Sequence, residues 1–184
     1  TTPAGFSELL EGMAPSRVAL EVGSHSPWVS RLVARMQHEV IVANPYKLKL
    51  ITASVRKNDR VDAEQLARLA RVDPKLLSPI HHRSEQAQGD LAVIRARSEL
   101  MEARTKLVNA ARGMAKPFGE RLKKCDADQV GEALGKELSP AVQAAVGPLL
   151  KSIEKISEQI EAYDEKIAEM GKRNVTIDSF LNNP

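Results

Sequence analysis

Three carboxylates in this chain have the types and spacing that a divalent-metal site needs. Glu21 closes the apolar run 18–20, and Asp59 and Asp62 stand three residues apart where a helix is expected to begin. Residues three apart share one face of a helix, where like charges repel unless a cation lies between them. Two hard cations held by carboxylates can stabilise both the attacking and the leaving oxygen of a phosphodiester. The pattern is therefore typical of Mg²⁺-dependent phosphodiester chemistry.

A purely structural interpretation of the same acids stays open. Acidic side chains in the first turn of a helix complement the positive end of the helix dipole. Asp59 and Asp62 therefore need no metal to account for them, and on spacing alone this is the more common outcome.

The segments around Glu21 predict one βαβ unit. Residues 17–22 read as a short apolar strand, a helix follows that Ser26 caps, and residues 39–43 read as a β-branched strand. Such a unit has parallel strands joined by a right-handed crossover. Ligands gather at the carboxyl ends of parallel strands, where Glu21 and Asn44 both lie.

Three stretches of the sequence then carry a specific resemblance. They are Arg17 to Gly23 (RVALEVG), Val40 to Pro45 (VIVANP) and Lys57 to Ala63 (KNDRVDA). In order and spacing they resemble the DEDD-motif insertion-sequence transposases, which are relatives of the Piv DNA invertase. The similarity extends over about residues 1–115, and a helical segment like the family's coiled coil follows.

The resemblance implies both a fold and a site. In that family a RuvC-like domain of ribonuclease-H type carries Asp, Glu, Asp and Asp as metal ligands. Glu21, Asp59 and Asp62 match the last three, which makes them the expected catalytic residues and the expected ligands of Mg²⁺, with Mn²⁺ as a substitute.

The sequence departs from the family pattern in two places. No residue before Glu21 matches the first Asp, and no segment matches the downstream domain that bears a nucleophilic Ser. The chain also begins without Met, and residues 173–184 read as a tail toward that further domain. We therefore expect a piece of a longer transposase that is inactive by itself.

The implied function is DNA strand cleavage and transfer during transposition of an insertion sequence. DNA is the expected partner, together with a guide RNA in those members that use one. The expected location is the bacterial cytoplasm at the nucleoid, because no apolar run has membrane-spanning length and the single Cys125 excludes an internal disulfide. The alternative is a non-catalytic helical module that dimerises or binds DNA.

Basic residues are concentrated in two blocks. Residues 31–75 and 83–124 each carry ten Lys or Arg against five Asp or Glu, whereas residues 126–170 carry four against ten. Basic blocks suit a polyanion because phosphate contacts release condensed counterions, although a solvated basic face explains them as well. The candidate nucleic-acid-binding residues are Lys47, Lys49, Arg56, Lys57 and Arg60.

The composition predicts an α/β chain that is predominantly helical. Hydrophobic residues make up 42% and aromatic residues only 3%, which is typical of helices packed by aliphatic side chains. We expect a truncated RuvC-like domain over residues 1–80 and a long helical hairpin or coiled coil over 81–172. Helices are expected at 84–116, near 128–137, and from Pro140 onward.

The last helix has the clearest periodicity in the chain. Its apolar residues, spaced alternately by three and four, are Val146, Leu149, Ile153, Ile156, Ile160, Tyr163, Ile167 and Met170. This spacing predicts a coiled coil. Two partners are open: helix 84–116 folding back antiparallel, or the same helix of a second subunit. The regularity favours the second, and hence a homo-oligomer.

Overall fold

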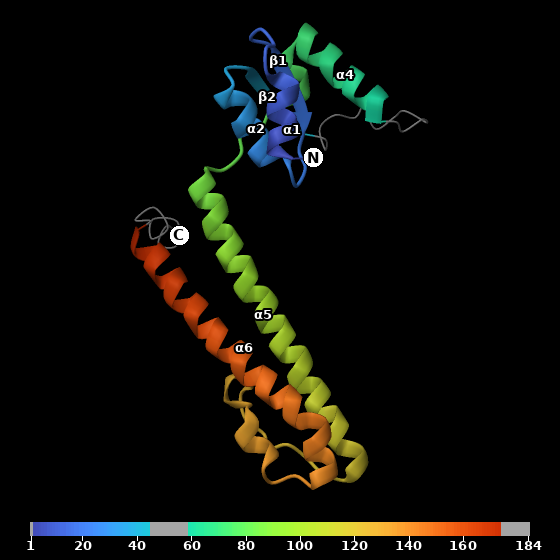
Figure 1. Ribbon diagram of the computed structural model, residues 1–184, viewed down its shortest axis with the longest axis vertical. Coiled ribbons are helices and arrows are strands. Elements are labelled where there is room, and N and C mark those ends of the chain that lie inside the picture. The colour runs from blue at the N-terminus through green and yellow to red at the C-terminus, as the bar shows by residue number, and fades with distance from the viewer. Residues whose placement is uncertain (1, 45–58, 174–184) are drawn as a thin grey trace, which may run out of the picture. The chain divides into compact units, whose positions relative to one another are not determined.

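Residues 2–44 and 59–173 are described by the computed structural model of the chain. The chain divides into two compact units, residues 1–83 and 84–184. The described part is mostly helical, with one small parallel sheet and a long C-terminal helix (Figure 1). A predominantly helical α/β chain was expected, and this coarse class is confirmed.

The first unit contains the expected pair of parallel strands. Strand β1 spans Arg17–Glu21, strand β2 spans Glu39–Ala43, and Glu21 lies opposite Ala43 at the end of the sheet. Helix α2 (Ser26–Arg35) connects them. Helix α1 (Pro3–Leu10) precedes β1, and it begins at Pro3 because the Thr2 side chain accepts a hydrogen bond from the Gly5 amide at 3.3 Å.

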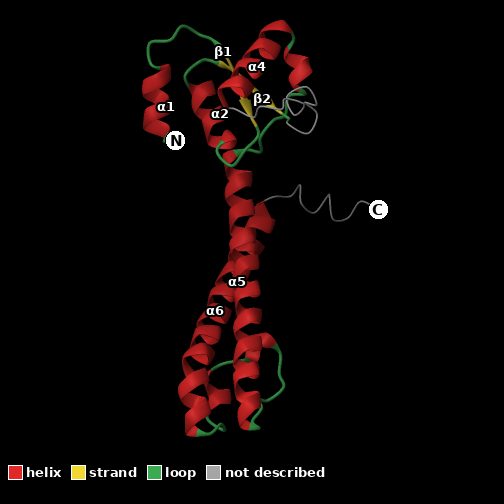
Figure 2. Cartoon of the chain, turned by 90° about the vertical axis from the view of Figure 1, so that its right-hand side faces the viewer, coloured by secondary structure: helices red, strands yellow, loops and turns green. Residues whose placement is uncertain are grey.

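The two faces of the sheet are covered by different helices (Figure 2). Successive strand residues point to opposite faces, so Val18, Leu20 and Val40 pack with α1 and α2. The intervening Ala19, Ile41 and Ala43 pack with helix α4 (Asp59–Val72) and the 3₁₀ turn η2 (Pro74–Leu77). The first unit is thus a three-layer arrangement with its small sheet in the middle.

The second unit is an antiparallel helical hairpin. Helix α5 spans Glu85–Ala115 and helix α6 spans Pro140–Arg173, and both views show them side by side (Figures 1 and 2). Ser84 begins α5 by accepting a hydrogen bond from the Ala87 amide at 3.1 Å. The hairpin was one of the two partners expected for the last helix.

The connection between the helices differs from the expectation near 128–137. Instead of an α-helix, it contains the short 3₁₀ turns η3 (Lys116–Phe118), η4 (Ala127–Gln129) and η5 (Glu132–Gly135). Glycine allows this loop to lie directly on α6. A Cβ atom at Gly135 would stand 3.0 Å from Leu150, and one at Gly131 would stand 3.2 Å from Glu154.

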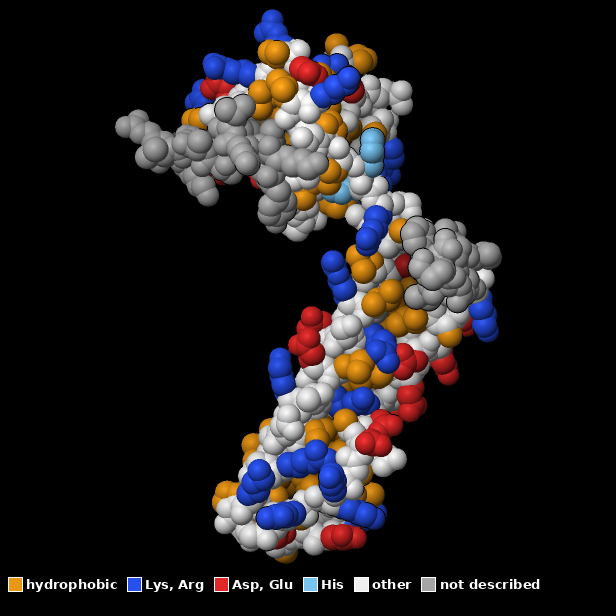
Figure 3. Space-filling model, turned by 180° about the vertical axis from the view of Figure 1, so that it is seen from behind, with side chains coloured by type: hydrophobic (Ala, Val, Ile, Leu, Met, Phe, Trp, Pro, Cys, Tyr) orange, Lys and Arg blue, Asp and Glu red, His pale blue; other side chains and the backbone are white. Residues whose placement is uncertain are grey.

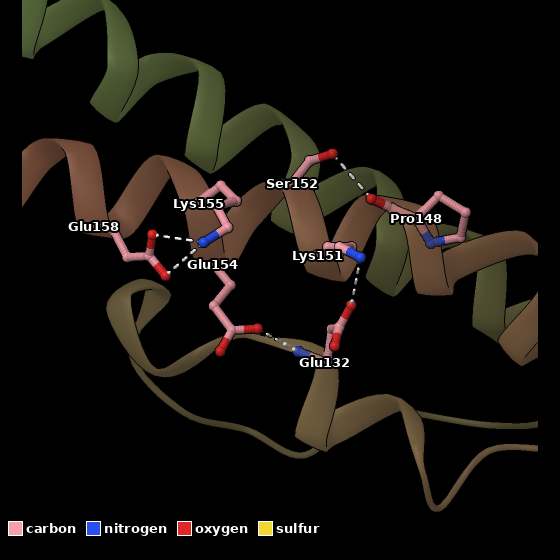
Figure 4. Close-up of polar contacts among 7 residues, drawn as sticks. All are labelled: Glu132, Pro148, Lys151, Ser152, Glu154, Lys155 and Glu158. Atoms are coloured by element: carbon pink, nitrogen blue, oxygen red, sulfur yellow. Dashed lines mark hydrogen bonds and ion pairs between the residues drawn. The ribbon is translucent and has the colours of Figure 1, made fainter.

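Polar contacts fasten the same loop to α6, as Figure 4 shows. The Glu132 amide donates to the Glu154 carboxylate at 3.3 Å, and Lys151 lies 3.9 Å from the Glu132 carboxylate. Beneath the loop is the main core of the unit, to which both helices and the loop contribute. Its buried members are Val108, Ala111, Ala115, Leu122, Val130, Leu138, Val142, Val146, Leu150 and Ile153.

The contact face of α6 is shifted from the predicted stripe. Val146, Ile153, Ile160 and Met170 are buried as predicted, but Leu150 and Ser157 are buried in place of the half-buried Leu149 and Ile156. The strict pattern from Leu149 to Met170 is therefore wrong as a description of the seam with α5.

No helix among residues 2–44 and 59–173 combines the length and the apolar character that crossing a bilayer requires.

Candidate metal and nucleic-acid site

Glu21 lies where the sequence placed it, at the carboxyl end of β1, with its side chain exposed. The loop that follows is held in place by backbone and side-chain hydrogen bonds. The Val22 amide donates to the Ala43 carbonyl at 3.2 Å, which extends the strand pairing one residue past Glu21.

Ser26 fixes that loop rather than capping the helix as expected. Its hydroxyl donates to the Gly23 carbonyl at 2.8 Å and accepts from the Gly23 amide at 3.1 Å. The side chain is buried, with 4% exposed. Helix α2 already includes Ser26, and His25 precedes it without a side-chain capping bond. The hydroxyl is therefore committed to the turn beside Glu21.

Asp59 and Asp62 occupy the first turn of α4, as expected. Asp59 is exposed and Asp62 is half-buried. Their position still satisfies the structural interpretation, because acids in a first turn stabilise the helix dipole without any ligand.

Helix α4 packs directly against β1. At the start of β1, the Arg17 guanidinium donates to the Ala70 carbonyl near the end of α4 at 2.8 Å. A groove beside this contact is lined by Arg17 and Ala19 of β1 and by Ala67, Ala70 and Arg71 of α4. The last turns of α4 are thus held against the strand that ends in Glu21.

The three acids nevertheless do not form a complete metal cluster. Across residues 2–44 and 59–173, no group of three His, Cys, Asp or Glu side chains comes close enough to hold a metal ion. Carboxylate oxygens are chemically suited to Mg²⁺, but these side chains as placed do not make a three-ligand site.

Four of the five candidate nucleic-acid-binding residues lie outside the described residues. These are Lys47, Lys49, Arg56 and Lys57. The fifth, Arg60, is exposed in the first turn of α4, between the two acids in sequence.

A second group of cations was missed as a site by the sequence analysis. Four basic side chains and Leu122 line a hollow of about 300 Å³ in the second unit, namely Arg112, Lys116, Arg121 and Lys124. The basic block 83–124 was the available signal. Which of its members converge could not be foreseen, because the connecting loop brings them together.

Comparison with known proteins places the α/β unit together with helix α5 in a family. The model of the DEDD transposases of IS110 type, described as a transposase family, matches residues 1–117, which include all three acids. The chain therefore belongs to this transposase family. The match confirms the resemblance drawn from the sequence.

A curated relative agrees with that assignment. A protein of Sinorhizobium fredii (strain NBRC 101917 / NGR234), named as a transposase, y4pF/y4sB, is 32% identical over 112 residues. The alignment covers 61% of this chain and 28% of the relative, so the chain spans little more than a quarter of that protein's length. No solved structure matches the chain.

Proposed function

We propose that this chain is part of a transposase that cleaves DNA strands and transfers them in a metal-dependent reaction during insertion-sequence transposition. Family membership supports the class of protein. The observation that supports the site is that Glu21 ends β1 while α4, which carries Asp59 and Asp62 in its first turn, packs on the same small sheet.

Within this proposal the first unit is a RuvC-like domain of ribonuclease-H type. A parallel strand pair with helices on both faces and acids at the strand and helix ends is compatible with that fold. Glu21, Asp59 and Asp62 would hold Mg²⁺ or Mn²⁺, which would supply charge stabilisation for the reacting phosphate. The three side chains do not by themselves form a complete metal cluster.

DNA is the proposed partner, bound by Lys47, Lys49, Arg56, Lys57 and Arg60. A guide RNA belongs to the same proposal, since bound RNA would present the same phosphate chemistry. Cations so near the acids in sequence would hold the nucleic-acid backbone without reading its base sequence.

Metal binding by the full chain tests the site directly. Titration with Mn²⁺, followed by its paramagnetic resonance signal, is expected to show weak binding that the pair Glu21→Gln and Asp62→Asn abolishes. Glu64→Gln is the matched control, because Glu64 is an exposed acid of the same helix that pairs with Arg68. Equal Mn²⁺ affinity of the unaltered chain, the double variant and the control would show that Glu21 and Asp62 are not metal ligands.

DNA binding and cleavage test the rest. We expect the chain to bind duplex DNA with little sequence preference, and with affinity that falls steeply between about 50 and 200 mM salt. Replacing Lys47, Lys49, Arg56 and Lys57 by Ala should weaken binding to all sequences alike. Little or no cleavage is expected from this chain, and strong cleavage that survives Asp59→Ala would place the active site elsewhere.

The second candidate function is a non-catalytic helical module for dimerisation or DNA binding. The hairpin of α5 and α6, with a core of its own, favours it. It would be preferred if no metal bound and DNA binding were retained.

A further inference from the structure

The end of the hairpin, where loops join α5 to α6, carries a concentrated positive charge. Arg112 lies in the last turn of α5, Lys116 lies in η3, and Arg121 and Lys124 follow in the loop. All four cations line one hollow. Figure 3 shows Lys and Arg side chains gathered over this end of the second unit. We call these four residues, together with Phe118, the tip patch.

Acids are sparse in the segment that carries these cations, and the acids Asp126, Asp128, Glu132 and Glu137 follow only later in the loop. From Arg112 to Cys125 the only acid is Glu120, and its carboxylate accepts a hydrogen bond from the Ser139 amide at 2.8 Å. Among the described residues none of the four cations forms an ion pair. Four like charges around one hollow repel each other, and a bound polyanion would relieve that repulsion.

The segment that carries these cations is held in place by a hydrogen bond and by the core of the unit. The Arg112 guanidinium donates to the Cys125 carbonyl at 3.0 Å, which ties the loop to the end of α5. Leu122, on the floor of the hollow, is 8% exposed and belongs to the main core of the unit. A surface fixed in this way loses little conformational freedom on binding, which favours affinity.

An exposed aromatic ring lies in the same segment. Phe118 is 58% exposed and stands two residues after Lys116. The described residues contain no other aromatic side chain among their large exposed hydrophobics. An aromatic ring beside cations is the arrangement on which unpaired bases stack while their phosphates are neutralised.

We propose that the tip patch binds single-stranded nucleic acid, with its cations on successive phosphates and Phe118 stacked on an unpaired base. This contact belongs to the second unit and uses none of the residues proposed for the metal site. It rests on the proposed function only in that nucleic acid is the partner. DNA and RNA offer the same chemistry, and the test separates them.

Fluorescence anisotropy with the full chain provides the test. The probes are labelled single-stranded DNA and RNA of the same sequence, longer than about 16 nucleotides, and the corresponding duplex DNA. The triple variant Lys116→Ala, Arg121→Ala and Lys124→Ala should reduce the slope of log affinity against log salt by about 2 for single strands, because each lost phosphate contact removes ~0.7. Arg112 is left intact because it supports the loop.

Phe118→Ala separates base stacking from charge. It should weaken single-stranded binding at least about fivefold, the lower end of the stacking contribution, and leave duplex binding unchanged. The stronger of the DNA and RNA probes identifies the nucleic acid that the patch prefers.

The control triple variant is Arg95→Ala, Lys166→Ala and Lys172→Ala, which removes equal charge elsewhere in the same unit. Equal effects of the two triple variants on single-stranded binding would overturn the proposal. It would also be overturned if polyglutamate displaced the labelled probes as effectively as unlabelled nucleic acid, because the patch would then be a site for acidic protein. Circular dichroism melting checks that each variant is folded. The variant that replaces Lys47, Lys49, Arg56 and Lys57 by Ala tests the proposed DNA site of the first unit independently. The tip-patch proposal and the proposed function can therefore fail separately.

Discussion

At the scale of single residues, the candidate site depends on how the turn after β1 is held. Glu21 is the last residue of its strand, and the turn that follows has its backbone polar groups satisfied by the buried Ser26 hydroxyl. A part-buried amide that loses its hydrogen-bond partner lowers the stability of the fold. The position of the Glu21 carboxylate is thus supported by a residue that would never itself touch a ligand.

Ser26→Ala should therefore destabilise the first unit by about 1 kcal/mol, because the Gly23 amide loses its partner. The Gly23 carbonyl keeps the hydrogen bond from the Ser26 amide at 3.2 Å. Urea unfolding followed by the fluorescence of Trp28, the single tryptophan of the chain, reports this unit. Ser24→Ala, at an exposed position in the same turn, is the control. Equal stabilities of the two variants would show that the Ser26 hydroxyl does not hold the turn.

Two carboxylates of the second unit make its stability depend on pH. A hydrogen bond from Arg97 holds the pKa of Asp164 below its ordinary value, and hydrogen bonds from Ser139 lower the pKa of Glu120. A carboxyl group whose pKa is lower in the folded state stabilises the fold above its unfolded pKa, and loses that contribution as pH falls through the folded pKa.

The hairpin should accordingly melt at a lower temperature at acidic pH than at neutral pH. Asp164→Asn should reduce that difference, whereas Glu165→Gln, at the exposed neighbouring position, should leave it intact. Melting curves by circular dichroism at both pH values give the comparison. An unchanged pH dependence in Asp164→Asn would mean that the pair with Arg97 contributes nothing in solution.

What the sequence could predict at this scale was residue type and local position. An acid after an apolar strand and two acids in a first helical turn are local features, and each was found in its expected element. Whether the three converge depends on how residues distant in sequence pack, which spacing does not encode. Ser26 shows the same limit, since a Ser before Pro is an ordinary cap signal and the competing bond to Gly23 becomes visible only in the folded turn.

At the scale of elements, polar pairs set the register of the hairpin. Arg97 of α5 donates to both carboxylate oxygens of Asp164, and Arg104 donates to the Ser157 hydroxyl at 3.2 Å. Seven residues separate the arginines on α5, and seven separate their partners in the reverse direction on α6. The helices therefore stay antiparallel and in one register across both pairs.

These pairs explain why the predicted stripe was shifted. Spacing by three and four fits a stripe through Leu149 and Ile156 as well as one through Leu150 and Ser157. Apolar character alone selects the first, whereas the arginines of α5 accommodate a polar residue in the second. The expected helix near 128–137 failed for a related reason, because close approach to α6 at Gly131 and Gly135 outweighs the helical propensity of their neighbours.

Two adjacent leucines of α6 provide a test of which face of that helix packs against α5. Leu150 is fully buried and Leu149 is half-buried, so Leu150→Ala should destabilise the hairpin by about 2–5 kcal/mol. Leu149→Ala should have a clearly smaller effect, although it removes the same atoms. Chemical denaturation of the second unit, followed by far-ultraviolet circular dichroism, measures both. A larger loss for Leu149 would restore the stripe that the sequence predicted.

At the scale of the whole molecule, the candidate metal-binding acids and the tip patch belong to different units of the chain. The first unit carries the candidate acids and Arg60, and the second carries the tip patch followed by the acidic stretch 126–170. Lys and Arg outnumber Asp and Glu up to residue 124, and the order reverses beyond it. A polyanion approaching the second unit would thus be attracted to the cations of the tip patch and repelled by the acids that follow them in sequence.

Self-association stays a prediction, and the hairpin changes which residues would carry it. Helix α5 already covers Ile153 and Ile160, so these no longer need a second subunit. Ile94 and Met101 of α5 remain 44% and 38% exposed, and they lie two turns apart on one face of the helix. A second copy packed there would bury both.

We therefore expect dimers or larger species at tens of micromolar, and we expect Ile94→Lys with Met101→Lys to produce monomers. Each lysine would place a charge in an apolar contact, where it has no partner. Light scattering measures the mass, and circular dichroism confirms that the hairpin persists in the variant. Val72→Lys, at a residue of the first unit that is 79% exposed, controls for added charge. If the unaltered chain is a monomer at these concentrations, the hairpin satisfies α6 within one chain and the oligomer prediction is wrong.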